Sequence, residues 1–155
     1  MLVRSLLVLA TAALLAVGCG GSDDNVAETR SVEDQIAAFV ADNNLTDVQT
    51  TGSGLVYTIL EPGGAERPTV ADDITINYRG YLVDGRTFDQ TDGTPRTFPL
   101  SRLIPAWQEA IPLIGRGGEI QILAPPSTAY GENPPAGTGI TANSVLVFDI
   151  ELVDF

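Results

Sequence analysis

An aromatic ring and a carboxylate stand next to each other at Phe88–Asp89, at the end of a run that is typical of a β-hairpin, Tyr78–Asp89. The turn of this hairpin is predicted at Asp84–Gly85, because Asp-Gly pairs favour tight two-residue turns. Further along the chain come apolar and aromatic candidates for the same pocket: Ile104, Trp107, Tyr130, Ile140 and Phe148. Together these residues predict a concave aromatic site around one acid.

The residue types that are missing limit the chemistry of such a site. The chain contains no histidine, and its only cysteine, Cys19, is far in sequence from the candidate pocket residues. A pocket without an activated nucleophile suits a reaction in which no covalent bond is broken. We therefore expect neither a metal ion nor a cofactor.

The elements that must hold these residues are predicted as short strands and one interior helix. Alternating apolar residues and turn signals predict strands over 55–60, 74–83, 86–89, 119–124 and 144–153, and a short extended piece over 97–100. A helix is predicted over 105–113, since Pro105 suits the first helical position and Trp107 and Ile111 share one side. The sum is an α+β fold, an antiparallel sheet of about five strands wrapped over one short helix.

A second short helix is predicted over 31–44, before the main domain, which we place at 45–155. Ser31 suits its N-cap, and Ile36 and Phe39 fall on one face. A helix of this length is marginal alone, so it is expected to pack on the main domain or on a second copy of the chain as a weak homodimer.

The first nineteen residues are interpreted as a targeting signal. Residues 1–18 have the proportions of a signal peptide, with Arg4 before an apolar stretch that is too short to span a bilayer comfortably. The sequence up to Cys19 resembles a bacterial lipoprotein cleavage site, which implies a lipid anchor on Cys19 and a flexible tether over 19–30. The alternative is an ordinary secretory signal followed by a free thiol. By resemblance, Gly20 after the cysteine favours an outer membrane facing the periplasm, if the cell has one.

The charge of the chain is −12, from 20 acidic and 8 basic residues. Such an acidic surface would repel the phosphates of nucleic acid, so no nucleic-acid partner is expected. Membrane contact is expected through the lipid anchor alone, which places the protein in the cell envelope, outside the cytoplasm.

Five blocks in order along the chain resemble the FKBP-type peptidyl-prolyl isomerases. They are I-N-Y-R-G-Y-L-V-D-G-R-T-F-D (76–89), F-P-L (98–100), L-I-P-A-W-Q-E-A-I (103–111), A-Y-G (129–131) and N-S-V-L-V-F-D-I-E-L (143–152). The resemblance covers roughly residues 55–155. It implies a half-barrel sheet around a short helix, and an enzyme that accelerates rotation about X-Pro bonds in polypeptides.

The resemblance also implies roles for individual residues. Trp107 would form the floor under the substrate proline, Ile104 would offer its backbone N–H and Tyr130 its hydroxyl to substrate carbonyls, and Asp89 would face the twisting imide. The remaining substrate-binding positions fall on Tyr78, Phe88, Phe98, Leu103, Ile140 and Phe148. The chain departs from the family at Arg96, where an aromatic residue often stands.

Plainer interpretations remain open for three of these residues. Asp89 could simply tie down the hairpin, or orient Tyr78 or Arg86. Trp107 could be an ordinary core tryptophan, and the Tyr130 hydroxyl could satisfy the backbone of its own loop. At the level of function, the alternatives are a chaperone module that binds proline segments with little turnover, and an envelope structural protein.

Overall fold

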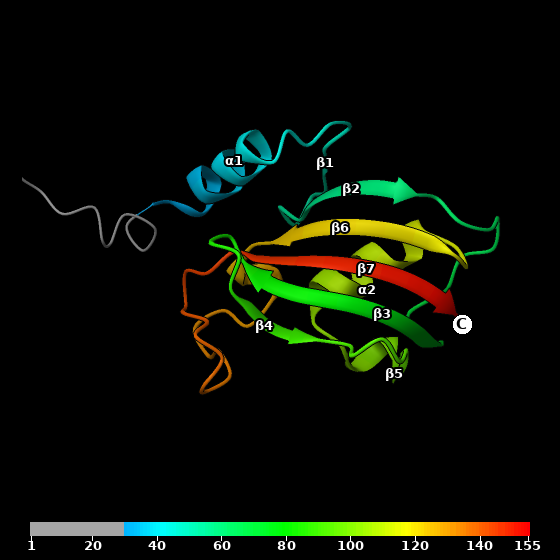
Figure 1. The fold of residues 1–155 in the computed structure, drawn as a ribbon. Coiled ribbons are helices and arrows are strands. Elements are labelled where there is room, and N and C mark those ends of the chain that lie inside the picture. The colour runs from blue at the N-terminus through cyan, green and yellow to red at the C-terminus, as the bar shows by residue number, and fades with distance from the viewer. Residues whose placement is uncertain (1–29) are drawn as a thin grey trace, which may run out of the picture.

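The computed structural model describes residues 30–155, and these form one antiparallel sheet of seven strands (Figure 1). The strands are β1 Gln49–Thr50, β2 Val56–Glu61, β3 Asp73–Leu82, β4 Thr87–Gln90, β5 Arg96–Pro99, β6 Gly118–Ala124 and β7 Leu146–Asp154. Their order across the sheet is β1-β2-β6-β7-β3-β4, and β5 also pairs with β3. The predicted α+β class is confirmed. The predicted count of about five strands is too low, because the two-residue β1 was not foreseen and the short 97–100 segment is a paired strand.

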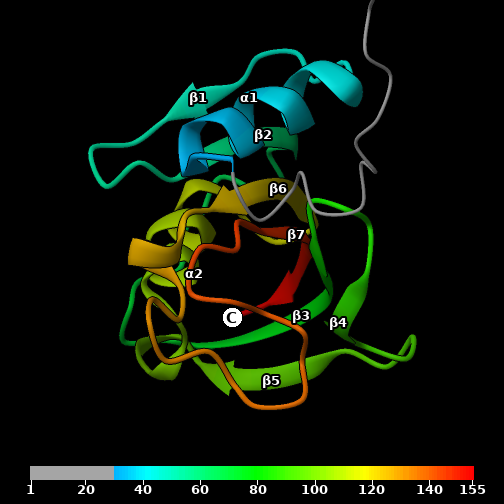
Figure 2. The same cartoon turned by 90° about the vertical axis from the view of Figure 1, so that its left-hand side faces the viewer.

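The interior helix α2, Pro105–Ala110, lies across one face of the sheet, as the two views in Figures 1 and 2 show. It is shorter than the predicted 105–113, because its last turn continues as the 3-10 helix η2, Ile111–Leu113. Pro112 explains the change, since proline lacks the N–H that would continue the α-helical hydrogen bonds. Two further 3-10 turns, η1 Leu100–Arg102 and η3 Pro126–Thr128, lie in the connections.

The main core lies between α2 and the inner face of the sheet. Strand β3 contributes its apolar side chains to this core, because Ile74, Ile76 and Tyr78 are buried in alternation with partly or fully exposed residues and so point to the same face. Neighbouring strands contribute Ile120, Ile122, Phe148, Ile150 and Leu152 to the same core. Trp107 of α2 packs into it from the other side.

The N-terminal helix α1, Val32–Asp42, covers part of the opposite face of the sheet (Figure 2). Ser31 caps it, and its side-chain oxygen accepts a hydrogen bond from the Asp34 N–H at 3.1 Å. The Phe39 ring is buried, and its centroid lies 6.3 Å from the ring centroid of Tyr81. A second apolar cluster forms around this contact: Phe39, Val56, Tyr81, Leu123, Val145 and Val147. Of the two predicted partners for this helix, the structure shows the helix packed on its own domain.

The predicted signal peptide over 1–18 and the lipid attachment at Cys19 lie outside the described residues, as does the tether up to residue 29. Within residues 30–155, no helix combines the length and the apolar character needed to cross a membrane. The anchor and its membrane therefore stay predictions from the sequence.

Candidate active site

Nine of the ten predicted pocket residues line one open cleft, with a cavity volume of about 160 Å³. The cleft lies between α2 and the inner side of β3, β4, β5 and β7. Its lining consists of Tyr78, Phe88, Asp89, Phe98, Leu103, Ile104, Trp107, Tyr130 and Phe148. The tenth residue, Ile140, is half-buried and packs against the neighbouring core, but it is absent from this lining.

Trp107 forms the floor of the cleft and is held by two other rings. It meets Tyr78 edge to face, with ring centroids 5.1 Å apart, and Phe148 in the same way at 5.3 Å. Phe88 continues the row by packing on Phe148 at 5.6 Å. Edge-to-face pairs at these distances are favourable, so the rings hold one another in place. Trp107 is only 5% exposed, so it belongs both to the core and to the wall of the cleft.

Gly80 allows these rings to approach the sheet, and the sequence reasoning did not identify it. It lies on β3, paired with Asp89 of β4 on one side and Phe148 of β7 on the other. A Cβ atom there would lie 2.8 Å from Cε2 of Phe88 and 2.9 Å from Cε1 of Phe148. A lone glycine inside a strand pattern often marks such a close approach, and that is the signal that could have found it.

Replacing Gly80 by alanine should therefore displace Phe88 and Phe148 and narrow the cleft. Overpacking of this kind costs about 1–3 kcal/mol of unfolding free energy, and ligand affinity should fall with it. Denaturant unfolding and peptide titration measure the two effects. Gly52→Ala is the matched control, because a Cβ at Gly52 meets nothing within 4 Å. Equal behaviour of the two variants would contradict the packing role of Gly80.

The carboxylate of Asp89 is tied to the cleft wall through Tyr78. The Tyr78 hydroxyl donates to Oδ2 of Asp89 at 2.6 Å, a short distance that is typical of a bond to a charged acceptor. Thr91 fixes the backbone of Tyr78, since its Oγ1 accepts from the Tyr78 N–H at 3.1 Å. Arg86 pairs with Asp84 instead, so of the two side chains that Asp89 could orient, the structure pairs it with Tyr78. Asp89 itself remains exposed to solvent.

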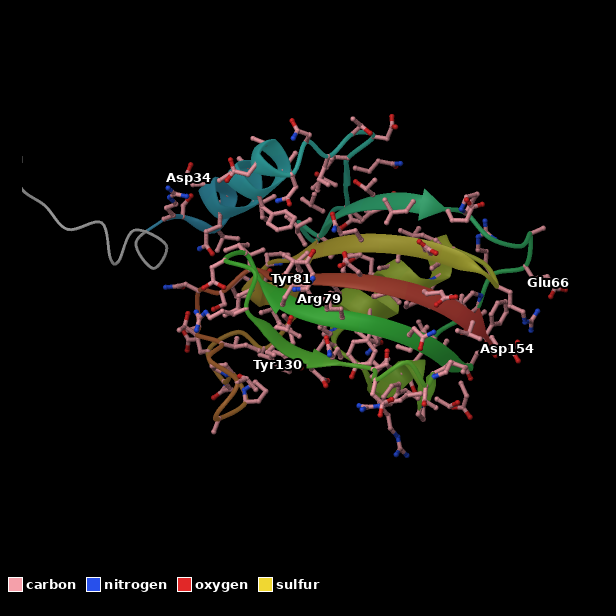
Figure 3. All side chains as sticks on the ribbon, viewed as in Figure 1. Asp34, Glu66, Arg79, Tyr81, Tyr130 and Asp154 are labelled. Atoms are coloured by element: carbon pink, nitrogen blue, oxygen red, sulfur yellow. The ribbon has the colours of Figure 1, made fainter. Side chains whose placement is uncertain are left out.

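Besides the buried indole N–H of Trp107, two hydrogen-bond donors at the cleft have no acceptor within residues 30–155. Among residues 30–155, the backbone N–H of Ile104 donates to no carbonyl or side chain, because Ile104 precedes the first turn of α2. The Tyr130 hydroxyl, in the loop before β7 (Figure 3), likewise makes no hydrogen bond within the described part of the chain. The bond from Tyr130 to its own loop, considered from the sequence, is therefore not present, and both groups are available to a ligand.

The tyrosines of the cleft are held in their neutral, proton-donating form. Burial raises the pKa of Tyr78 to about 12, and the hydrogen bond to Asp89 and its charge act in the same direction. Burial, and secondarily the charge of Asp89, also raises the pKa of Tyr130. Both hydroxyls therefore stay protonated at neutral pH and well above it.

Ligand binding and turnover in the cleft should be independent of pH between about pH 6 and about pH 9, because the chain has no histidine and its cleft tyrosines do not ionise there. A step in kcat/KM within that window would contradict this assignment.

Stability should fall at the alkaline end of the pH range. On the other face of the sheet, burial raises the pKa of Tyr81 to about 12, with the charge of Asp149 as the next cause. From about pH 10, where an unfolded tyrosine ionises, the unfolded chain binds fewer protons than the folded one, so unfolding free energy should fall until about pH 12. Urea unfolding at several pH values should show this fall, and Tyr81→Phe should reduce it. An equally steep fall in the variant would contradict the role of Tyr81.

No cluster of three or more His, Cys, Asp or Glu side chains within residues 30–155 is arranged to hold a metal ion. The cleft offers one carboxylate, aromatic faces and two neutral donors. This arrangement can bind an apolar ring, hold carbonyl oxygens next to it and exclude water, and it presents no nucleophile.

The chain is similar in sequence to a known family and to several of its members. Residues 64–153 match the family described as FKBP-type peptidyl-prolyl cis-trans isomerase. The chain is 46% identical over 110 residues to the FKBP-type peptidyl-prolyl cis-trans isomerase FkpA of Escherichia coli, covering 69% of this chain and 40% of that protein. It is 38% identical over 125 residues to the peptidyl-prolyl cis-trans isomerase Mip of Coxiella burnetii, covering 79% of this chain and 54% of that protein.

A solved structure is similar over nearly its whole length. The peptidyl-prolyl cis-trans isomerase of Pseudomonas syringae superposes with a TM-score of 0.70 at 26% identity, covering 86% of this chain and 98% of that one. The chain spans about half the length, or less, of the curated FkpA and Mip relatives that it matches.

Proposed function

The chain belongs to the FKBP-type peptidyl-prolyl cis-trans isomerases, and on this premise we propose that its cleft accelerates rotation about X-Pro bonds in polypeptides. The observation that carries the proposal is the open aromatic cleft, floored by Trp107 and walled by Tyr78, Phe88 and Phe148, with Asp89 at its rim. A proline ring is apolar and compact, so a pocket of this size and lining suits it.

The reaction requires no group that the cleft lacks. An X-Pro bond has partial double-bond character, and its rotation has a barrier of roughly 18–20 kcal/mol. At the twisted midpoint the amide loses resonance and becomes less polar than the planar ground state, which water stabilises better. A water-poor aromatic cleft prefers the twisted form, and each 1.4 kcal/mol of preference is about tenfold in rate.

The available donors fit the same reaction. In the proposed complex, the proline ring rests on Trp107, and the N–H of Ile104 and the hydroxyl of Tyr130 bind carbonyl oxygens of the substrate backbone. Holding the chain on both sides of the bond would restrict the substrate to conformations near the twisted one. The carboxylate of Asp89, oriented by Tyr78, then lies where it can interact with the turning imide.

The test is a protease-coupled assay of proline peptides with the full chain. Acceleration that saturates with peptide supports the proposal. The alternative, a chaperone module that only binds proline segments, predicts saturable binding without acceleration. The family match favours the enzyme.

We also propose that the protein is lipid-anchored through Cys19 in the cell envelope, outside the cytoplasm, where its substrates are exported polypeptides. Support comes from the sequence of residues 1–19, which resembles a lipoprotein signal, and from the small polar residues that follow. Slow X-Pro isomerisation, tens to hundreds of seconds when unassisted, makes such an enzyme useful during folding. Labelling with a fatty acid should mark the native chain and spare Cys19→Ser; equal labelling would contradict the anchor.

Weak self-association through α1 stays a subsidiary proposal. The helix already buries Phe39 against its own sheet, so a dimer would have to use the remaining apolar rim of α1. That rim borders a groove of about 600 Å³ lined in part by Val32, Ile36 and Pro125. Sedimentation equilibrium of the native chain and of Ile36→Ser tests it, and a monomer at all concentrations would contradict it.

A further inference from the structure

Arg96 lies on the cleft side of β5, two residues before Phe98, which lines the cleft. In the antiparallel pairing of β5 with β3, Arg96 lies opposite Ile76 and Phe98 lies opposite Ile74. Residues directly opposite each other share a face of the sheet, and so do residues two apart in one strand. Arg96 therefore shares the inner face with Phe98, which lines the cleft, and with Tyr78, two residues after Ile76.

Arg96 carries a charge that no ion pair within residues 30–155 neutralises. Its side chain is exposed, and none of the ion pairs within residues 30–155 includes it. The nearest carboxylate of the cleft wall, that of Asp89, accepts its hydrogen bond from Tyr78. Arg96 lies beside the same hydroxyl, because its charge and a hydrogen bond from its guanidinium both lower the pKa of Tyr78, against the larger, opposite effect of burial. A guanidinium that forms no ion pair within the described residues thus lies at the edge of the aromatic cleft, beside Tyr78.

We propose that Arg96 makes the cleft select proline segments that carry a carboxylate, on a glutamate or aspartate directly before or after the proline. Guanidinium groups bind carboxylates through a planar fork of donors. The protein as a whole repels acidic peptides, since its net charge is −12. At physiological ionic strength, salt largely screens the repulsion between the peptide and acidic residues more than about 8 Å away. A direct contact between the peptide carboxylate and Arg96 is shorter than this distance, so it is screened much less. The inference rests on the proposed use of the cleft for proline segments.

The experiment compares peptides that differ only next to the proline. One series has Glu, Gln or Lys before the proline, and a second has them after it, all titrated onto the full chain at physiological salt. Binding is followed by the fluorescence of Trp107, the chain's single tryptophan and the cleft floor. In at least one series we expect Glu to bind about two- to fivefold more tightly than Gln, the scale of one exposed ion pair. Arg96→Gln should bring the Glu-to-Gln ratio to about one, and Arg96→Glu should favour Lys.

Arg67→Gln is the matched control, because it removes the same charge from the β2–β3 loop, where Arg67 bonds to the carbonyl of Gly64. It should leave the Glu-to-Gln ratio as in the native protein. A native ratio of one in both series, or an equal loss of preference in Arg67→Gln, overturns the inference. Because the ratio is a binding ratio, it is independent of turnover: preference without acceleration contradicts the isomerase proposal alone, and acceleration without preference contradicts only the role of Arg96.

Discussion

Asp89→Ala is expected to lower kcat/KM for a proline peptide by about 10- to 100-fold while changing the unfolding free energy by less than about 1 kcal/mol. The carboxylate is exposed, so its removal opens no cavity and leaves no buried charge. What is lost is the acceptor for the Tyr78 hydroxyl, 2.6 Å away, and, in the proposed complex, the negative charge beside the turning imide. Asp92→Ala, an equal change of charge outside the cleft lining, is the control for long-range electrostatics.

A double-mutant cycle with Tyr78→Phe separates two ways in which Asp89 could act. If the carboxylate works by orienting Tyr78, then Tyr78→Phe should cost about as much activity as Asp89→Ala, and the double variant little more. If the carboxylate acts on the substrate directly, Tyr78→Phe should retain most of the activity. Losses of rate and of stability in equal proportion would mean that Asp89 only ties down the hairpin.

The parts of the site that could be predicted from the sequence are those set by local pattern. The β3–β4 hairpin follows from Asp84–Gly85, and the turn has Gly85 at a φ of 89°, a conformation that glycine adopts readily. Alternation along β3 and β7 correctly assigns side chains to the two faces of the sheet. Trp107 reaches the cleft because the helix begins at Pro105, as its sequence indicates.

The parts that could not be predicted depend on contacts between distant segments. Strand β1 has two residues and exists only because β2 pairs with it. Gly80 is required by two rings from other strands. A lone glycine in a strand pattern indicates a close approach, but the local sequence does not show which residues make it. The segment 125–143 is rich in Pro, Gly and Thr and has no periodicity. The sequence predicts both Tyr130 and Ile140 for the cleft, but its local pattern could not show that only Tyr130 lines it while Ile140 packs beside it.

Trp107→Ala should have the largest effect on the protein as a whole. Truncating a buried tryptophan costs about 3–5 kcal/mol of unfolding free energy, a large share of the 5–15 kcal/mol typical of a domain. The indole contacts Tyr78 and Phe148 edge to face, so both walls lose their support together with the floor. We expect a large loss of stability and near-complete loss of proline-peptide turnover. Circular dichroism must follow unfolding, because the variant has no tryptophan left.

Phe39→Ala is the control that distinguishes loss of activity through unfolding from loss of activity through removal of the Trp107 ring. Phe39 is an equally buried ring on the opposite face of the sheet, where it packs on Tyr81, and its truncation should cost a similar free energy. At a temperature where both variants are folded, Phe39→Ala should keep native kcat/KM per folded molecule and Trp107→Ala should not.

Trp107→Phe should restore part of the activity, since it keeps an aromatic floor and removes an indole N–H that is buried without a partner in residues 30–155. Native kcat/KM in folded Trp107→Ala would show that the ring serves only the core, and that the cleft does not act on proline through it.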